Sequence, residues 1–380
     1  MIAIIVATPL QMFNATMIMR HHYPKAKADL FVLNIACDMH DIISKYQKLP
    51  FVNSVYYLED VCHRLSRIGI IRDFLITTKK QKFILDSVKN VEYTDLFSTW
   101  VGKTNTWLFS KLKRTNPDLK LHFYEEGLGV YLKGLFDTVH GLKYMYYLLG
   151  YKYEGDYLQD LYMYNPDLAF NNEIIKMIPI GSAQEEDIMY IKSVLEVDNI
   201  LQYRTKGIYF ENDFRSTEFE GVDEKQIIDL LYKSLGKDQL TVRMHPRNPK
   251  DKYQFQNYII DQNSKNSWED ILIALDNLND LVLITLNSTA VFTPKMIYGK
   301  EPVIVILGKM IMNEYSYQPW AQNFWDLQLI QKNIPVKKGV EYKITFDARA
   351  TVDRPVSLQI AGGLTTYKLG SRYHKYTRYF

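Results

Sequence analysis

The fold is decided by the first 35 residues, MIAIIVATPLQMFNATMIMRHHYPKAKADLFVLNI (residues 1–35). Two short apolar runs, residues 1–8 and 28–35, have the composition of β-strands. The segment between them, residues 11–24, has the pattern of a helix. Strands that are apolar along their whole length and alternate with helices predict a parallel sheet that is covered on both faces.

The same alternation continues for most of the chain. Residues 51–58 and 120–126 are strand-like, and residues 104–114 are helical in pattern. After residue 200 the rhythm restarts, with an amphipathic helix that ends at Gly236. Strand-like runs in this second part are found at 207–213, 239–249, 280–286 and 301–307. We therefore expect an α/β fold in which two Rossmann-like domains face a cleft.

The domain organisation follows from where this rhythm changes. Residues 1–165 form an expected N-terminal Rossmann-like domain, and residues 201–335 form an expected C-terminal one. Between them, residues 166–200 contain Asn and Pro and are predicted to be an interdomain connection. Residues 336–380 differ, because apolar and polar residues alternate there with period two, which predicts antiparallel strands with one wet face.

Composition excludes several classes of protein. The net charge is +3, so a nucleic-acid partner is not expected. The two cysteines, Cys37 and Cys62, are too few for a disulfide scaffold and favour a reducing, cytoplasmic location. The N-terminus lacks the basic region of a signal peptide, and no apolar run reaches the ~18 residues of a spanning helix. The last 14 residues interleave basic and aromatic side chains, so peripheral contact with the inner face of the plasma membrane stays an open alternative.

Polar side chains follow three of the predicted strands. They are Glu125-Glu126-Gly127, His245-Pro246-Arg247 and Asn287-Ser288-Thr289. In an open α/β sheet, ligands bind beyond the carboxyl ends of the strands. Each group also has a simpler interpretation, as the start of a solvated loop, as a turn, or as a helix N-cap. Their shared position in both predicted domains favours a common site.

The chemistry of these residues fits glycosyl transfer. A carboxylate can take a proton from an acceptor hydroxyl, and a like-charged neighbour raises the pKa of one member of a pair. His245 is a candidate to protonate or hydrogen-bond a departing phosphate, with Arg243, Pro246 and Arg247 around it. Asn287, Ser288 and Thr289, placed before a predicted helix, are a candidate anion site.

Metal binding is not expected, because the chain has no Asp-x-Asp motif of the kind that holds a divalent cation on a nucleotide-sugar diphosphate. Glu-x-Asp triplets do occur, two of them at positions that bear on metal binding. Glu185–Asp187 has the setting of a surface helix, whereas Glu211–Asp213 follows a predicted strand and leaves metal use open.

Taken together, these motifs resemble a known family. The segments ATPLQMFNA (7–15), YEEG (124–127), MHPR (244–247) and NSTAVFTPKMIYGKEPV (287–303) are similar to those of bacterial sialyltransferases of glycosyltransferase family 52, the lipooligosaccharide sialyltransferase family. Bacterial polysialyltransferases share the acidic pair, the His-Pro and the Ser-Ser/Thr. The resemblance covers roughly residues 1–330.

The resemblance implies a GT-B-like fold and an inverting transfer from CMP-sialic acid to a cell-surface glycan such as a capsule, an exopolysaccharide or a lipooligosaccharide. It implies that the enzyme requires no metal and no other cofactor. Glu125 is then the general base and Glu126 the weaker candidate, while His245, Ser288 and Thr289 meet the CMP phosphate.

Three further residues are weaker candidates for the nucleotide site. Trp268 and Glu269 match a family segment near the nucleotide, but they also fit a plain helix start. Gln11, in the loop after the first strand, faces the cleft if the family geometry holds, and otherwise starts a helix.

Several points stay open at this stage. Many relatives carry Asp where this chain has Glu125 and Glu126, which leaves the donor uncertain. A same-fold transferase that uses another nucleotide sugar and a non-catalytic glycan-binding protein are the alternatives. The segment 336–380 resembles part of a carbohydrate-binding module, yet it is too short for a two-sheet domain of ~100 residues. The oligomeric state, a homodimer included, is not fixed by the sequence.

Overall fold

The structure is a computed structural model. It describes residues 1–33, 39–59, 76–99, 102–131, 144, 146–169, 175–195, 203–212, 222–249, 251–254, 256–261, 267–275, 278–308, 343–348, 354–360, 363–369 and 374–379. The chain forms two compact units, Met1–Asp326 and Leu327–Phe380. The first unit contains two parallel sheets, and the second contains antiparallel strand pairs. Cys37 and Cys62 lie outside the described residues.

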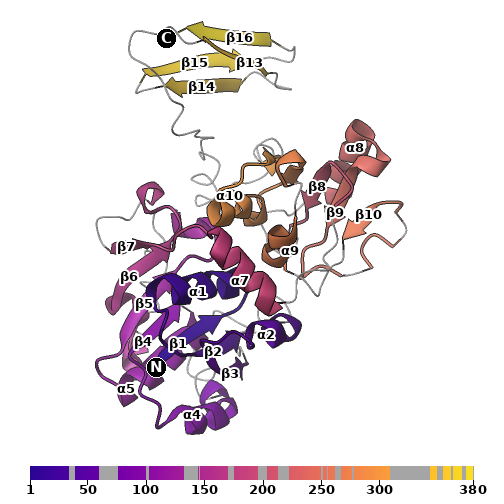
Figure 1. Ribbon diagram of the computed structural model, residues 1–380. Helices are drawn as coiled ribbons and strands as arrows, with labels where there is room; N and C mark the ends of the chain where they lie inside the picture. Colours follow the sequence, from indigo (N-terminus) through magenta and orange to yellow (C-terminus); the bar gives the residue numbers. More distant parts are fainter. Residues whose placement is uncertain are drawn as a thin grey trace. The chain divides into compact units, whose positions relative to one another are not determined.

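The first sheet has seven parallel strands in the order β3-β2-β1-β4-β5-β6-β7 (Figure 1). Its strands are β1 (Ile2–Val6), β2 (Ala28–Leu33), β3 (Val52–Leu58), β4 (Asp95–Ser98), β5 (Lys120–Tyr124), β6 (Leu158–Met163) and β7 (Lys176–Pro179). Its helices are α1 (Pro9–His22), α2 (His40–Tyr46), α4 (Lys82–Val88), α5 (Lys103–Thr115) and α7 (Glu185–Leu195), with 3-10 turns η1 (Leu128–Tyr131), η3 (Glu154–Asp156) and η4 (Pro166–Leu168).

Helices cover both faces of this sheet, as the apolar strands predict. On β1, Ile2, Ile4 and Val6 pack into a buried cluster with residues of α1, α2 and α7. The alternate residues, Ala3 and Ile5, pack into a second cluster with residues of α4 and α5. Successive side chains of a strand point to opposite faces, so a strand buried on both sides has no polar face.

The second sheet has five parallel strands in the order β10-β9-β8-β11-β12. Its strands are β8 (Gly207–Phe210), β9 (Leu240–Arg243), β10 (Ile259–Asp261), β11 (Val282–Thr285) and β12 (Val303–Ile306). Its helices are α8 (Glu224–Leu235), α9 (Trp268–Ala274) and α10 (Thr293–Tyr298), with 3-10 turns η7 (Lys237–Gln239), η8 (Leu278–Asp280) and η9 (Thr289–Val291). Two parallel, helix-covered sheets confirm the predicted fold class of two Rossmann-like halves.

Local sequence explains where key helices begin and end. Thr8 caps α1, because its side chain accepts the N–H of Gln11 at 3.2 Å, and Pro9 occupies the first helical position. Asp223 caps α8, which ends at Gly236 in a positive-φ conformation, as the sequence predicts. These caps place Gln11 and Glu224 in the first turns of their helices, and both side chains belong to the candidate functional site.

The predicted connection, residues 166–200, contains regular structure. It holds β7, the edge strand of the first sheet, and α7. Asp187 of α7 forms ion pairs with Arg20 and His21 of α1. The N–H of Ala183 donates to the carbonyl of Ile297 in α10 at 2.6 Å. The segment therefore contacts helices that belong to both sheets.

The second unit consists of antiparallel strand pairs, as the period-two pattern predicts. Strands β13 (Lys343–Ala348) and β16 (His374–Tyr379) pair with each other. Strands β14 (Arg354–Ile360) and β15 (Gly363–Leu369) form the other pair.

Within the described part of the chain, every helix is too short or too polar to cross a lipid bilayer.

Candidate functional site

The three predicted motifs do follow the carboxyl ends of parallel strands. Glu125, Glu126 and Gly127 come directly after β5 of the first sheet. In the second sheet, β9, β8 and β11 are neighbours, and residues 245–247 and 287–289 follow the two outer members of this trio. Because the carboxyl ends of parallel strands meet at one edge, the two second-sheet motifs lie on either side of the end of β8.

Glu125 is fully buried and is held by neutral donors. Its Oε2 accepts the hydroxyl of Tyr131 at 2.7 Å and the N–H of Tyr164 at 2.8 Å, whereas its buried Oε1 has no hydrogen-bond partner in the described part of the chain. The side chain of Asn14 in α1 fixes the backbone here, donating to the carbonyl of Glu125 at 2.7 Å. Burial raises the pKa of the Glu125 carboxyl to about 7, against the opposing effect of the Tyr164 and Tyr131 donors.

Glu126 is partly exposed and is held more weakly than its neighbour. Its Oε2 accepts a long bond, 3.4 Å, from Nε2 of Gln11. The other end of that amide is fixed, because Oε1 of Gln11 accepts the N–H of Ala7 at 2.6 Å. Burial raises the pKa of Glu126 to about 7 as well, with the Gln11 bond opposing the shift. Of the pair, Glu126 is therefore the carboxyl that a ligand can reach, and Gln11 is the residue that orients it.

Gly127 brings the acidic motif of the first sheet against the Asn-Ser-Thr motif of the second. A Cβ built on Gly127 would lie 3.1 Å from both Cγ2 and Oγ1 of Thr289. Gly127 also has φ +146°, which side-chain-bearing residues rarely adopt. The backbone conformation therefore favours glycine at this position, and a side chain there would also make a tight contact with Thr289.

The Asn-Ser-Thr loop is ordered by its own hydrogen bonds. Ser288 caps η9, since its Oγ accepts the N–H of Ala290 at 3.3 Å, and its own N–H donates to Oγ1 of Thr285 at 3.0 Å. The helix expected after this loop is divided into η9 and the six-residue α10. Ser288 keeps a hydroxyl hydrogen to donate, and it lies with Asn287 and Thr289 in a half-buried loop.

Trp268 and Glu269 begin α9, which starts with a capping box between Ser267 and Asp270. The Trp268 indole is buried in the core of the second sheet, and its Nε1 donates to the carbonyl of Ala290 at 2.8 Å. It therefore holds the Asn-Ser-Thr loop from behind. Glu269 is buried as well, and burial raises its pKa to about 7.

His245 lies in a tight loop after β9. The backbone N–H of Arg247 donates to Nδ1 of the His245 ring at 3.2 Å, and the N–H of Asn248 donates to the His245 carbonyl at 3.0 Å. A ring nitrogen that accepts an N–H carries no hydrogen, so in the neutral ring the hydrogen is on Nε2. Pro246 and Arg247 are exposed beside it. The loop thus presents a ring N–H donor and one exposed guanidinium.

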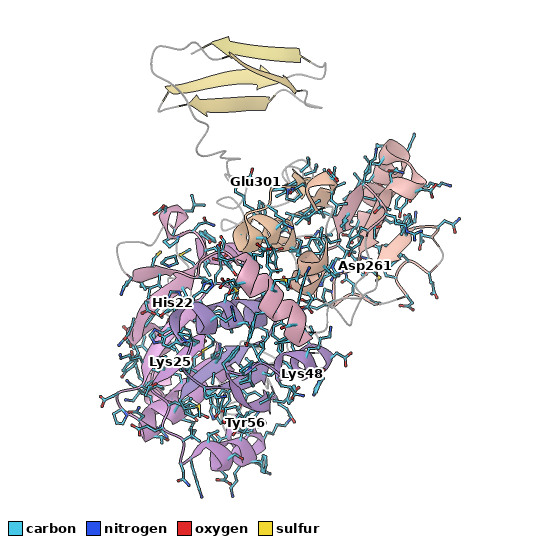
Figure 2. All side chains as sticks on the ribbon, viewed as in Figure 1. His22, Lys25, Lys48, Tyr56, Asp261 and Glu301 are labelled. Carbon is cyan, nitrogen blue, oxygen red and sulfur yellow. The ribbon has the colours of Figure 1, made fainter. Side chains whose placement is uncertain are left out.

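Arg243, predicted to add charge beside His245, makes a different set of contacts. Its guanidinium forms an ion pair with Asp261 of the adjacent strand β10 and donates to the hydroxyl of Tyr203. Asp261 is labelled in Figure 2. The guanidinium also stacks over the Trp268 ring, 5.6 Å from the centroid. These contacts fix Arg243 within the second sheet, so Arg247 is the more accessible cation of the loop.

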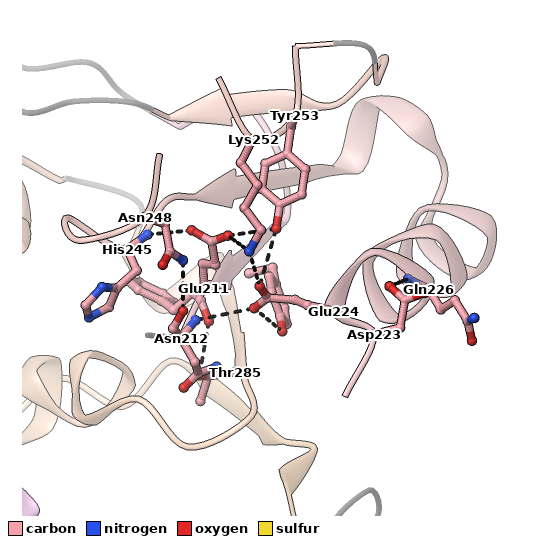
Figure 3. Close-up of polar contacts among 12 residues, drawn as sticks. Glu211, Asn212, Asp223, Glu224, Gln226, His245, Asn248, Lys252, Tyr253 and Thr285 are labelled. Atoms are coloured by element: carbon pink, nitrogen blue, oxygen red, sulfur yellow. Dashed lines mark hydrogen bonds and ion pairs between the residues drawn. The ribbon is translucent and has the colours of Figure 1, made fainter. Parts of the chain in front are cut away.

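A charged cluster that sequence reasoning missed lies behind His245 (Figure 3). The carboxylates of Glu211 and Glu224 are 2% and 4% exposed, and the ammonium of Lys252 bonds to both. The Glu211 carboxylate also accepts the backbone N–H of His245 at 2.8 Å. The sequence marks Glu211 only as part of a Glu-x-Asp triplet, and Glu224 and Lys252 have the setting of solvated charges, so no sequence pattern marks the cluster as a whole.

Metal binding gains no support from the described side chains. Both oxygens of Glu211, the carboxylate for which metal use stayed open, accept protein donors. Its partner in the triplet, Asp213, lies outside the described residues. Asp187 of the other triplet pairs with Arg20 and His21. Among described residues, His, Cys, Asp and Glu side chains form no group of three or more suited to a metal ion.

Comparison with known proteins gives a likeness of fold and nothing finer. No family model matches the chain, and no curated protein matches it. UDP-GlcNAc 2-epimerase from Neisseria meningitidis, bound to UDP-GlcNAc, is 11% identical, with a TM-score of 0.47 over 80% of this chain and 82% of that one. The same enzyme from Methanocaldococcus jannaschii is 13% identical, with a TM-score of 0.43 over 82% and 90%.

A family 9 glycosyl transferase from Veillonella parvula is 11% identical, with a TM-score of 0.34 over 84% of this chain and 92% of that one. At such identities and scores, a likeness does not extend to activity or substrate.

Proposed function

We propose that this chain is an inverting glycosyltransferase that moves sialic acid from CMP-sialic acid to a hydroxyl of a cell-surface glycan. One observation carries the proposal: the contact of Gly127 with Thr289 places a carboxyl pair of raised pKa beside a hydroxyl-rich loop. The choice of CMP-sialic acid as donor rests on the motif resemblance alone.

In this proposal Glu126 is the general base. A base must reach the proton that it removes, and Glu126 is the partly exposed member of the pair. The family resemblance implies Glu125 as the base, but that side chain is enclosed by Tyr131 and Tyr164. A carboxyl with a pKa near 7 accepts a proton effectively near neutral pH, because its basicity matches the working conditions. We assign Glu125 to positioning and Glu126 to proton transfer.

The reaction then balances as a single displacement. The acceptor hydroxyl oxygen forms a bond to the anomeric carbon of the donor sugar, and its proton passes to the Glu126 carboxylate. The bond from the anomeric carbon to the phosphate oxygen breaks, and its electron pair leaves with CMP. The His245 Nε2–H and the hydroxyls of Ser288 and Thr289 are the donors that we assign to the phosphate oxygens.

The first experiment tests the nucleotide. A ligand that binds only the folded protein raises its stability, by about 2.7 kcal/mol at a hundred times its Kd. CMP should therefore raise the melting temperature of the full chain, and UDP and GDP should not. A rise with UDP or GDP instead would identify another nucleotide-sugar donor, and no rise with any nucleotide would contradict a transferase.

The second experiment tests the base. Glu126→Gln should lower transfer by about 10²–10⁴-fold while CMP binding is retained, because the base contributes to the rate and not to nucleotide affinity. Glu125→Gln is the matched control, one residue away and with the same change of group. If Glu125→Gln is inactive and Glu126→Gln is near wild type, the two roles are reversed.

A further inference from the structure

The charged cluster behind His245 is centred on the Glu211 carboxylate, whose two oxygens make different contacts. Oε2 of Glu211 accepts the backbone N–H of His245 at 2.8 Å. Oε1 of the same group bonds to the ammonium of Lys252 and accepts the hydroxyl of Tyr253 at 2.8 Å. An amide in place of this carboxylate would turn a donor toward one of these partners, so the geometry requires an ionised group.

Lys252 makes that ionised state stable in a buried position. Its ammonium lies 2.9 Å from Oε2 of Glu224, and the hydroxyl oxygen of Tyr253 lies 3.3 Å from the same Oε2. Burial opposes ionisation of Glu211, but the Lys252 bond and the other donors hold the pKa of Glu211 below its ordinary value. Burial raises the pKa of Glu224 to about 7, with Lys252 opposing and Glu211 reinforcing the shift. Glu211 is thus the fixed charge of the cluster.

The cluster holds the His245 loop at both ends. Glu211 and Asn212 are consecutive residues after β8, and Asn248 donates from its side chain to the carbonyl of Asn212 at 2.9 Å (Figure 3). The N–H of Asn212 in turn donates to Oε1 of Glu224, the first residue of α8. The start of α8 and the end of β8 are therefore joined to the first and last residues of the loop 245–248.

We propose that Glu211, Lys252 and Glu224 form a charge clamp that positions the His245 loop, so that the ring accepts the Arg247 N–H at Nδ1 and presents Nε2–H outward. Through this clamp, the three residues act on the phosphate of the donor without contacting it. The use of the ring on a phosphate rests on the proposed function. The clamp itself is a property of the fold and can be measured without any substrate.

The test compares variants that release the loop with variants that do not. Glu211→Gln removes the charge at nearly constant shape. Asn248→Ala removes the hold on the far end of the loop without leaving a buried charge, so it folds even if Glu211→Gln does not. Asp229→Asn is the matched control, since Asp229 pairs with Lys225 on the exposed face of the same helix α8.

Two measurements on the full chain decide the outcome. The first is the ¹⁵N spectrum of the histidine rings, with the His245 signal assigned by His245→Gln. The second is hydrogen exchange at the backbone amides of His245, Arg247 and Asn248. The wild type should show one ring tautomer, with hydrogen on Nε2. In both loop variants the two tautomers should mix and amide exchange should speed up by about tenfold or more. Asp229→Asn should match the wild type.

A mixed tautomer in the wild type would overturn the proposal. So would a folded Glu211→Gln or Asn248→Ala protein whose ring signal and amide exchange match the wild type. Neither result depends on a nucleotide. If CMP, UDP and GDP all fail to bind while the ring and amide results hold, the proposed function fails and the clamp stands.

Discussion

Two buried glutamates at strand ends, Glu125 and Glu211, have opposite protonation behaviour. Among the described residues, Glu125, after β5, has two neutral donors, the Tyr131 hydroxyl and the Tyr164 N–H, and one of its oxygens has no partner there. Glu211, after β8, has a lysine within bonding distance and donors on both oxygens. The pKa of Glu125 is raised to about 7 by burial, whereas that of Glu211 is held below its ordinary value.

This difference shows what a cation partner does for a buried carboxyl. With Lys252, the group is a fixed charge that can organise a loop. A buried carboxyl without a cation partner exchanges its proton near neutral pH. Its ionised form reduces the stability of the folded state. A group of the second kind is costly for structure alone, so its presence beside the Gly127–Thr289 contact favours a chemical role.

The largest expected effect comes from removing that cation. Lys252→Met leaves two buried carboxylates facing each other, and the loss of one partner of a buried ion pair costs about 3–5 kcal/mol. The free energy of unfolding from urea titration at about pH 7.5 measures it. Lys225→Met is the control, because its partner Asp229 is exposed and exposed pairs contribute about 0–1 kcal/mol. Equal losses of the free energy of unfolding in Lys252→Met and Lys225→Met would contradict the prediction that the buried ion pair contributes more than the exposed one.

Glu125→Gln should raise the free energy of unfolding, whereas Lys252→Met should lower it. The folded-state pKa of Glu125, about 7, lies above the ordinary value of 4.5, so the folded state binds more protons between these pH values. The free energy of unfolding of the wild type therefore falls as the pH rises from about 4.5 to about 7, and it stays reduced above that. The amide has no proton to lose, so at about pH 8 the variant should be more stable than the wild type by about 2–3 kcal/mol.

The measurement for this prediction is urea unfolding at several pH values. Near pH 4.5 the variant and the wild type should agree, and the difference should grow with pH. Glu126, Glu224 and Glu269 keep contributions of the same sign, so the slope is reduced and not abolished. Glu185→Gln, on an exposed turn of α7, is the control. A variant that is less stable than the wild type at every pH would show that Glu125 is a structural anchor in its ionised form.

Gly127→Ala should lower the free energy of unfolding by a smaller amount. This loss has two separable parts, one from the backbone conformation and one from the contact with Thr289. The positive φ disfavours any side chain, and the new Cβ would meet Thr289 at 3.1 Å. Together these should destabilise the protein by about 1–2 kcal/mol. Thr289→Ala removes both Cγ2 and Oγ1, so a double-mutant cycle with this substitution should recover the steric part and leave the backbone part. Purely additive losses would mean that the two residues do not meet.

The sequence predicts the apolar strands well. It predicts much less well the short edge strands and the segments between the strands. Strands such as β1 and β11 are apolar over nearly their whole length, and their pattern predicts both their place and their two buried faces. β7, with the sequence KMIP, is too short to be recognised, and it falls in a segment that was predicted to be a connection. Short edge strands depend on a neighbour for their hydrogen bonds, which a local pattern does not record.

The candidate site shows the same difference between what the sequence predicts and what only the fold shows. Glu125, Glu126, His245 and Ser288 could be chosen because each follows a recognisable strand. Lys252 and Glu224 could not, because a Lys among polar residues and a Glu in a first helical turn have the composition of a solvated surface. Only the fold brings them together behind His245, across 28 residues of sequence. The different exposures of Glu125 and Glu126 are likewise set by tertiary packing, through Tyr131 and Tyr164.

The smallest expected effect concerns the C-terminal unit. Its strands pair among themselves, β13 with β16 and β14 with β15, and it forms a compact unit separate from residues 1–326. The carboxyl pair, the His245 loop and the Asn-Ser-Thr loop are all contained in the first unit. Deletion of residues 338–380 should therefore leave the urea midpoint of the first unit unchanged. Turnover on a small soluble acceptor should stay within a few-fold of the full chain, and Glu126→Gln in the truncated chain is the inactive control. A truncated chain that is folded but inactive on the small acceptor would show that the C-terminal strands complete the catalytic fold.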